Sequence, residues 1–496
     1  MSAAATSVLP EVTLANSKDC THLEKLLAHL YSESPHFADL IQHVLRSVGG
    51  RLSLILYCDG LTPGAALAHD NKRKSVVWYG SFLEFGYMLQ HEELWWTICS
   101  KRLADANRSP AGISGITRGM LRDMFVDQGI STRGIKLAGQ IVRISFHALL
   151  ADEEALNACW GIKGASGIVP CAIMCSVVGK PPSTDVEAGL PSLAQRSALI
   201  QDIGCSDIKR IGLKSDADVW ALADEVAASH GTTRLKVTEK SRGINYHGEA
   251  LLFDLELRRH VKPATCNRFD AMHILYSSGV LSQEVMLLLN AVKDKHGYYF
   301  KELREFLAPW RYPKARVHNS PADVFNVHRE SSSKETLKAG ASELLSVYPG
   351  LRYFVVEAFA KSDKIQRELT SLLSLTDICD LCTQGMHCRT AARAEELATR
   401  LEQAIPKYLE SFKGVYGERA LRFKHHLLMH LPAHLRADGR LLTCFTLERK
   451  HVVSKQCFNH YKHAEKMPVG ALARMLNAQV LLLLLVARLR CRPPMG

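Results

Sequence analysis

The chain has 496 residues, of which 47% are hydrophobic, and its formal net charge at pH 7 is +12. This length exceeds that of a small disulfide-stapled scaffold and allows several structural units, or one domain with a long insertion. The basic balance suits a polyanionic partner such as nucleic acid, because neutralised phosphates release counterions. An ordinary basic protein has the same composition, so charge alone does not decide between the two.

The cysteines and the chain start indicate the compartment. The 14 cysteines are scattered, and residues 1–13 lack the basic segment followed by an apolar segment that marks a secretory signal. We therefore expect an intracellular protein with reduced thiols. The most apolar run, residues 480–487, is much shorter than the ~20 residues that a membrane span needs. No membrane partner is expected.

The first 100 residues predict a helical segment followed by strands. Leucines at helical spacing predict a helix within residues 17–48. A Gly/Pro-rich turn is expected at 59–64, directly after the first strand. Strands joined by short connections favour an antiparallel meander. The three strands are expected at 52–58, 75–85 and 94–99.

A helix at 114–128 and a fourth strand at 140–150 are expected next. The first strand ends at Asp59, and the fourth is followed by Asp152. Three strands, a helix and a fourth strand, with acids after the first and fourth strands, form the order of a ribonuclease H-like sheet.

The middle of the chain predicts mostly helices. Residues 179–184 have the composition of a linker, and the region from there to about residue 420 is largely helical in pattern. Ser215 and Ser332 each begin a Ser-x-x-acid pattern, which is typical of a helix N-terminus. The clearest helical periods are at 217–229, 282–294 and 393–412.

Two carboxylates that follow strands are candidate metal ligands. Asp59 stands on a short apolar strand, and such a rigid platform suits phosphoryl transfer by two divalent ions held ~4 Å apart. The alternative for Asp59 is a turn cap, which is common at strand ends. Asp152 opens an acidic cluster and is a second candidate ligand. Its alternative is a helix N-cap.

Glu448 is a third candidate acid and is expected on a helix. Three basic residues of the same segment, Arg449, Lys450 and Lys455, are candidates to contact a phosphate backbone. The alternative is a solvated glutamate on an ion-paired helix face.

Two groups of cysteines were compared with zinc sites, which prefer tetrahedral Cys/His sets with short paired spacings. Cys171 and Cys175 have three residues between them, and neither group is a complete site by itself. The second group lies in an amphipathic helical region, so buried thiols are the preferred interpretation there. It consists of Cys379, Cys382, His387 and Cys388.

Three histidines, His426, His430 and His434, are spaced four residues apart, which would align them on one helical face. Pro432 interrupts that helix before the third histidine. We therefore interpret His425, His426 and His430 as polar edges of a packed helix, with proximity to the active centre as the minor alternative.

Taken together, five segments resemble CACTA-like (En/Spm-related) transposases. Residues 54–63 resemble the first catalytic block, where a strand ends in Asp and a Pro-containing turn follows, and 75–85 fit the next block. Residues 149–175 resemble the second block, where a strand-end Asp precedes a Gly-rich step and a cysteine pair. Residues 268–273 resemble the Asp-x-Met-His element of the family's insertion. Residues 424–451 resemble the third block, whose acid lies on a helix after a His-Leu-Pro turn.

This resemblance implies a mixed α/β, ribonuclease H-like core with a large, mostly helical insertion. It implies a nuclear DNA transposase in which Asp59, Asp152 and Glu448 bind two Mg²⁺ ions for phosphodiester cleavage and strand transfer. Its partners would be the element ends, the target DNA and a second copy of the chain. Asp270, with His273, is the competing second acid. We prefer Asp152 because it directly follows a strand.

The implied organisation divides the chain into four parts. An N-terminal helical segment covers 1–49, the first part of the core 50–178, the helical insertion 179–420, and the last catalytic helix with the tail 421–496. The family usually has two residues between its paired cysteines, whereas Cys171 and Cys175 have three. This departure from the family spacing counts against structural Zn²⁺ at this pair.

Two alternatives remain open. Only about 50 residues precede the first block, without zinc-finger spacing, whereas family members often carry a separate region there that binds the element ends. An inactive, transposon-derived protein that binds DNA or another partner is therefore the main alternative. An unrelated helical scaffold with coincidental matches is the third reading.

Overall fold

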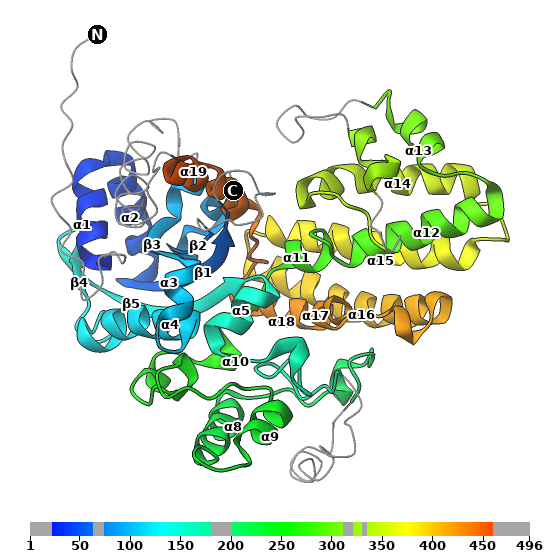
Figure 1. Cartoon of the computed structure of the whole chain (residues 1–496). Coiled ribbons are helices and arrows are strands. Elements are labelled where there is room, and N and C mark those ends of the chain that lie inside the picture. The colour runs from blue at the N-terminus through cyan, green and yellow to red at the C-terminus, as the bar shows by residue number, and fades with distance from the viewer. Residues whose placement is uncertain (1–21, 63–73, 180–200, 311–320, 330–334, 460–496) are drawn as a thin grey trace. The chain divides into compact units, whose positions relative to one another are not determined.

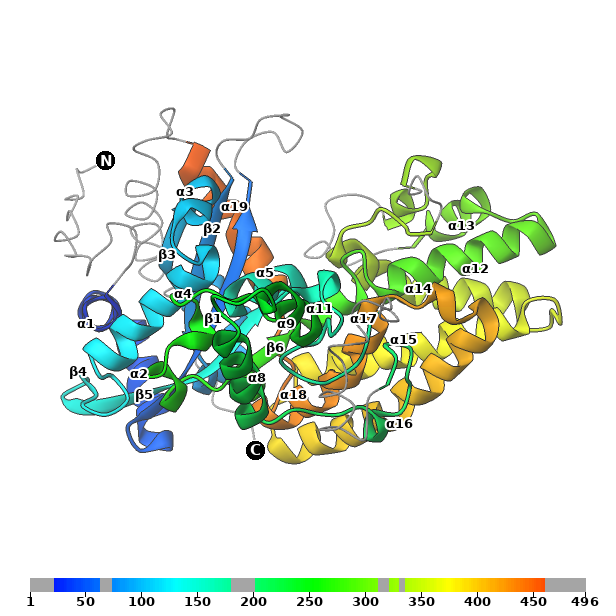
Figure 2. The same cartoon turned by 60° about the horizontal axis from the view of Figure 1, so that its bottom comes forward.

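The computed structural model describes the chain except residues 1–21, 63–73, 180–200, 311–320, 330–334 and 460–496. The chain divides into two compact units. Unit 1 comprises Met1–Met174, Lys214–Asn267 and Thr446–Gly496, and unit 2 comprises Cys175–Leu213 and Arg268–Phe445. Unit 1 combines a sheet with helices, and unit 2 is mainly helical (Figure 1 and Figure 2). The expectation of a mixed α/β fold rich in helices is confirmed.

The sheet of unit 1 is mixed. Its strands follow the order β3-β2-β1-β5-β4, and β6 also pairs with β5. β1 pairs antiparallel with β2, β2 antiparallel with β3, and β1 parallel with β5. The strands are β1 (Arg51–Leu61), β2 (Ser75–Phe82), β3 (Trp96–Arg102), β4 (Ile135–Leu137), β5 (Gln140–Ala151) and β6 (Asn267–Phe269).

Three of these strands confirm the predicted meander, and two details differ from the prediction. β1 continues through Asp59 to Leu61, where a turn was expected, because Asp59 and Gly60 pair with Val77 and Val76 of β2. β4 was not predicted. It joins β5 through Ala138 and Gly139, which both have positive φ angles of 54° and 77°. Such a turn usually carries Asn-Gly, so Ala-Gly gives a weak sequence signal.

Helices cover both faces of this sheet. Tyr57 and Tyr79 stack with ring centroids 5.9 Å apart, and both rings contact His451 of α19 (Phe445–Asn459). On the opposite face, Trp78 Nε1 donates a hydrogen bond to Thr117 Oγ1 of α4 (Gly112–Arg122) at 3.2 Å. The side chains of neighbouring strand residues therefore enter different layers, and α19 lies beside β1 and β2 (Figure 1).

The other helices of unit 1 include one correction. The predicted helix at 17–48 is two helices, because the Ser34 side chain accepts a hydrogen bond from Phe37 N and Pro35 begins the second helix. The predicted cap at Ser215 is confirmed as a capping box with Asp218. Unit 1 contains α1 (Leu23–Glu33), α2 (Pro35–Val48), α3 (Leu103–Arg108), α4 (Gly112–Arg122), α5 (Glu153–Trp160), α8 (Asp216–Ala228), α9 (Leu235–Arg242) and α10 (Pro263–Cys266).

Unit 2 is built around long helices. The helices predicted at 282–294 and 393–412 are confirmed, and both extend beyond these bounds. α15 and α16 lie along each other, as their short connection requires. The predicted cap at Ser332 lies outside the described residues. The helices are α11 (Ala271–Leu275), α12 (Val280–His296), α13 (Phe300–Leu307), α14 (Ala341–Phe359), α15 (Gln366–Met386), α16 (Ala391–Tyr416), α17 (Phe423–Leu427) and α18 (Leu431–Asp438).

A buried ion pair lies within unit 2. Arg268 donates from Nε to Asp438 Oδ2 at 2.8 Å and from Nη2 to Oδ1 at 2.9 Å. The two side chains are only 5% and 1% exposed. Each charge therefore depends on the other for most of its stabilisation.

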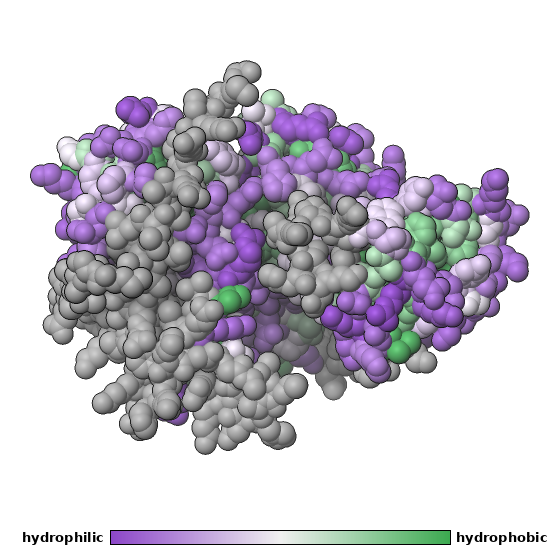
Figure 3. All heavy atoms as spheres, turned by 90° about the horizontal axis from the view of Figure 1, so that it is seen from above, coloured by the Kyte–Doolittle hydropathy of each residue, from purple (hydrophilic) through white to green (hydrophobic). Residues whose placement is uncertain are grey.

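No helix of the described residues is long and apolar enough to cross a membrane. Figure 3 shows hydrophilic residues over much of the visible described surface, with hydrophobic residues in smaller patches. Eleven of the described cysteines are free thiols, and all of these except Cys205 are buried.

Candidate functional site

The predicted acids Asp59, Asp152 and Glu448 all belong to unit 1. β1 and β5 run parallel, with Tyr57 opposite Leu150, so Asp59 and Asp152 follow this pair by two residues each. Their Cα atoms are thereby brought to the same edge of two neighbouring strands. Glu448 reaches the same place from α19, which covers the Tyr57 face of the sheet.

The Asp59 carboxylate is the centre of this cluster. Its Oδ2 accepts a hydrogen bond from Tyr57 OH at 2.9 Å, and its Oδ1 accepts one from Gly60 N at 2.6 Å. His451 Nδ1 lies 3.8 Å from Asp59 Oδ2 and 3.8 Å from Glu448 Oε2. One ligand atom from each of Asp59, Glu448 and His451 falls within 4.8 Å of the others. Two carboxylates and an imidazole thus converge at a size suited to a metal ion.

The electrostatics of Asp59 reflect this crowding. Burial, followed by repulsion from Asp152 and Glu448, raises the pKa of Asp59 from 3.8 to about 7, although hydrogen bonds from Tyr57 and Gly60 act in the opposite direction. Three acids that repel one another at a partly buried position cost free energy in the absence of a cation. The same arrangement is favourable when a divalent cation is bound.

We expect metal affinity at this cluster to depend on pH. A metal binds the ionised form of Asp59, whose pKa is about 7. Mn²⁺ affinity should therefore rise by up to about tenfold per pH unit below neutrality and level off above it. Isothermal titration calorimetry at several pH values measures this slope. Asp59→Asn is the control and should flatten it, whereas a flat profile in the wild-type protein would contradict the assignment.

Asp152 has the role of helix N-cap that the sequence offered as its alternative. It caps α5, and its Oδ1 accepts a hydrogen bond from Ala155 N at 2.7 Å. The cap fixes the carboxylate relative to the strand that precedes it. Repulsion from Asp152 contributes to the raised pKa of Asp59.

The basic residues beside Glu448 are differently placed. Arg449 is paired with Glu92 at 3.0 Å. Lys450 is buried, donates from Nζ to the Glu92 carbonyl at 3.3 Å and lies over the Tyr79 ring at 5.4 Å. These two cations hold α19 against the sheet. Lys455 is half-buried and remains a candidate to contact phosphate.

Asp270 and His273, the competing acid and its partner, belong to unit 2. The Asp270 carboxylate accepts hydrogen bonds from His273 Nδ1 at 2.6 Å and from Cys444 N at 3.0 Å, and it caps α11. Burial acts to raise the pKa of Asp270, but the bonds from His273, Cys444 and Met272 outweigh it and lower the pKa. Asp270 is thus a buried, ionised residue that ties two segments of unit 2 together.

A third cluster, which also lies in unit 2, contains Cys175, His426 and His430. Cys175 Sγ lies 3.3 Å from His426 Nε2 and 3.9 Å from His430 Nε2, and the two Nε2 atoms are 3.2 Å apart. Ligands at tetrahedral zinc distances would be about 3.3 to 3.6 Å apart. Burial lowers the pKa of His430, which keeps the ring neutral and able to coordinate. Cys171, the other member of the predicted pair, is buried at the end of unit 1.

The sequence analysis missed the two histidines of this cluster. Pro432 was expected to interrupt the helix that carries the histidines. His426 and His430 precede it, because α18 begins at Leu431 with Pro432 in its first turn. Only His434 lies beyond it, where its ring stacks on Phe269 with an interplanar angle of 14°. The spacing of four residues between His426 and His430 was therefore the usable signal.

The second cysteine group is part of the core. Cys379 and Cys382 are fully buried in α15. Burial raises the pKa of Cys382 to about 12, so its thiol stays protonated. This agrees with the interpretation of these residues as buried thiols.

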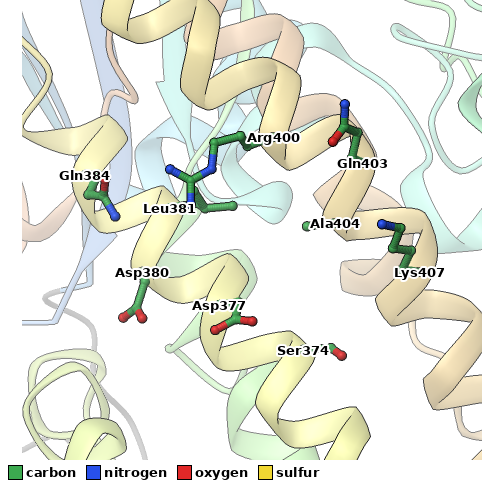
Figure 4. A pocket seen from close by; sticks show the side chains of 9 residues that line it. All are labelled: Ser374, Asp377, Asp380, Leu381, Gln384, Arg400, Gln403, Ala404 and Lys407. Atoms are coloured by element: carbon green, nitrogen blue, oxygen red, sulfur yellow. The ribbon is translucent and has the colours of Figure 1, made fainter.

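A pocket of about 470 Å³ lies between α15 and α16 of unit 2 (Figure 4). Asp377 and Asp380 line it from α15, and Arg400 and Lys407 from α16. Both acids are paired with Arg352 at 2.8 Å. Because the two acids share Arg352 and two further cations line the pocket, it is a poor candidate for a metal site.

Comparison with known proteins does not identify a family for this chain. No protein-family model matches this chain, and no curated protein shows significant sequence similarity to it. A fold hosts many functions, so the function must be argued from the three clusters of metal-ligating residues.

Proposed function

We propose that this protein cleaves phosphodiester bonds in DNA with divalent metal ions and transfers the resulting strand ends, as a nuclear transposase does. The observation that carries the proposal is the placement of three acids in unit 1: ligand atoms of Asp59 and Glu448 lie within 4.8 Å of each other, and Asp59 and Asp152 both follow the last parallel residue pair of β1 and β5 by two residues. Acids from two neighbouring parallel strands and one covering helix are the arrangement that the resemblance to CACTA-like transposases implies. The +12 net charge suits a DNA partner.

The sheet topology supports the same proposal. An antiparallel meander, β1 to β3, is followed by a strand that pairs parallel to β1. This is the order expected for a ribonuclease H-like core with acids on its first and fourth strands. The helices of unit 2 lie between β6 and α19 in the chain, as expected for a large insertion before the last catalytic helix.

The residues of the cluster fit a pair of Mg²⁺ ions, since they offer hard oxygen ligands on rigid elements. When bound, such ions supply Lewis acidity for an in-line attack of water or a 3′-hydroxyl on a phosphodiester. Tyr57 fixes the Asp59 carboxylate by donating a hydrogen bond to it. Asp152 is held by its helix cap, and Glu448 is half-exposed toward solvent.

A plasmid assay tests this function. Supercoiled DNA incubated with the protein and Mg²⁺ or Mn²⁺ should be nicked, and EDTA should abolish the reaction. An intermolecular joining assay with a 3′-hydroxyl oligonucleotide then tests strand transfer. Full activity in EDTA would refute metal dependence.

A catalytically inactive DNA-binding protein is the second candidate. The observation that favours it is His451, whose Nδ1 lies 3.8 Å from both Asp59 and Glu448. A protonated imidazole there would neutralise the acids in place of a metal. This candidate predicts DNA binding that is unchanged by Mg²⁺ and no cleavage under any metal condition.

We further propose that Cys175, His426 and His430 bind a structural Zn²⁺ ion in unit 2. Their mutual distances of 3.2 to 3.9 Å match a tetrahedral site, and their soft and imidazole ligands suit zinc. The sequence prediction of a Cys171–Cys175 pair supplies a candidate fourth ligand.

Metal analysis is expected to find one equivalent of zinc in the purified protein. Cys175→Ser and His430→Gln should each lose it, because removal of one ligand typically breaks a tetrahedral site. His434→Gln is the matched control and should retain the metal, since its ring stacks on Phe269 instead. Cys171→Ser tests the predicted fourth ligand. Undiminished zinc in Cys175→Ser and His430→Gln would refute the site.

A further inference from the structure

A second pocket, in unit 1, differs in character from the clusters described above. It has a volume of about 390 Å³, which is within the range of small-molecule sites. Its described lining contains no carboxylate, ammonium or guanidinium group. Polar groups come from Asn107, Ser114, Asn157, Asn245, Tyr246 and His247.

The chain fixes these polar groups by local structure. Asn157 lies on α5, and its amide packs against Gly164, where a Cβ atom would collide with the amide nitrogen. Asn245 Oδ1 accepts a hydrogen bond from Lys163 Nζ at 2.6 Å, which fixes the orientation of this amide. The Tyr246 ring is held between His230 and Phe253, with centroids 4.6 and 5.0 Å away.

The chemistry of this lining selects its ligand. A phosphate would require cations, and a metal would require carboxylates, thiolates or several imidazoles. Three carboxamides instead offer paired donors and acceptors on neutral groups, which match the edge of a nucleobase. Asparagine pairs in a bidentate manner with adenine N6 and N7.

We propose that this pocket binds an unpaired nucleobase of the DNA substrate, with adenine preferred. The inference rests on the proposed function. Asn157 lines the pocket from α5, and Asp152 is the N-cap of the same helix. A base in the pocket would therefore hold the substrate strand on the element that positions Asp152.

Neutral nucleosides test the pocket without the metal site. Saturation-transfer NMR with deoxyadenosine, deoxyguanosine, deoxycytidine and thymidine should show binding, strongest for deoxyadenosine, without added metal. Asn157→Leu is nearly isosteric and should weaken deoxyadenosine binding about tenfold, equivalent to about 1.4 kcal/mol. Asn107→Leu, at an exposed position, is a second variant expected to act in the same direction.

The matched control is Gln403→Leu, which removes an amide from the pocket of unit 2 and should leave binding unchanged. Asp59→Asn should also bind deoxyadenosine normally, so that loss of cleavage and loss of base binding are separable. Nucleoside binding without DNA nicking would support the pocket while the proposed function fails. Equal binding in the wild-type protein and both asparagine variants, or no binding of any nucleoside, would overturn the pocket.

Discussion

Replacing Asp59 by asparagine is expected to reduce metal-dependent DNA cleavage by about a thousandfold, which corresponds to about 4 kcal/mol of transition-state stabilisation. The amide keeps the size of the side chain and can still accept the hydrogen bond from Tyr57. It removes the negative charge at the centre of the cluster, where Asp152 and Glu448 both act on it. The plasmid nicking rate at saturating Mn²⁺ measures the effect.

The matched control is Glu154→Gln, which removes an exposed acid from the first turn of α5 near Asp152. It should nick at close to the wild-type rate, because Glu154 is not among the residues that converge on Asp59. Similar rates in Asp59→Asn and Glu154→Gln would remove Asp59 from the mechanism.

The same Asp59→Asn variant is expected to be more stable than the wild-type protein at pH 8 without metal. The folded protein raises the pKa of Asp59 from 3.8 to about 7, so the unfolded chain releases this proton first as pH rises. The contribution of Asp59 to the free energy of unfolding is therefore lost as pH rises from about 3.8 to about 7, and it stays lost at higher pH. Asparagine has no proton to release, and a gain of about 2 kcal/mol is expected in urea unfolding.

The second large effect concerns the buried ion pair of unit 2. Asp438→Asn is expected to destabilise unit 2 by about 3 kcal/mol or more, because Arg268 would keep a buried charge without its counter-ion. The pair is bidentate, and its side chains are 5% and 1% exposed. Hydrogen exchange of α18 amides in increasing urea measures the stability of this unit.

The control for this prediction is an exposed ion pair of the same unit, Arg304 with Asp323, whose side chains are 51% and 48% exposed. Asp323→Asn should cost less than about 1 kcal/mol. Equal losses in the two variants would mean that burial does not set the cost of losing the acid.

Local patterns predicted the strands but not their full extent. The apolar run before Asp59 identified β1, and the Gly/Pro-rich residues after it indicated a turn. The strand nevertheless continues to Leu61, because the ladder with β2 adds hydrogen bonds that the local pattern does not reveal. The parallel pairing of β1 with β5, which brings Asp152 beside Asp59, depends on residues about 90 positions apart in the chain.

Side-chain environment was the part least accessible from sequence. Lys450 was predicted to contact phosphate from its charge alone, yet its side chain is buried on the face of α19 that packs against Tyr79 of β2. His451 was not singled out, although it follows Glu448 by three residues and so shares its helix face. His426 and His430 had a visible spacing, but their partner Cys175 is about 250 residues earlier. Such groupings arise from packing between distant segments.

The central claim is that Asp59, Asp152 and Glu448 together hold divalent metal, and anomalous diffraction from crystals soaked in Mn²⁺ tests it most directly. We predict anomalous peaks about 2.1 Å from carboxylate oxygens of Asp59 and at least one of the other two acids. These peaks should disappear in Asp59→Asn crystals soaked in the same way. Manganese bound elsewhere, with none at Asp59, would contradict the account.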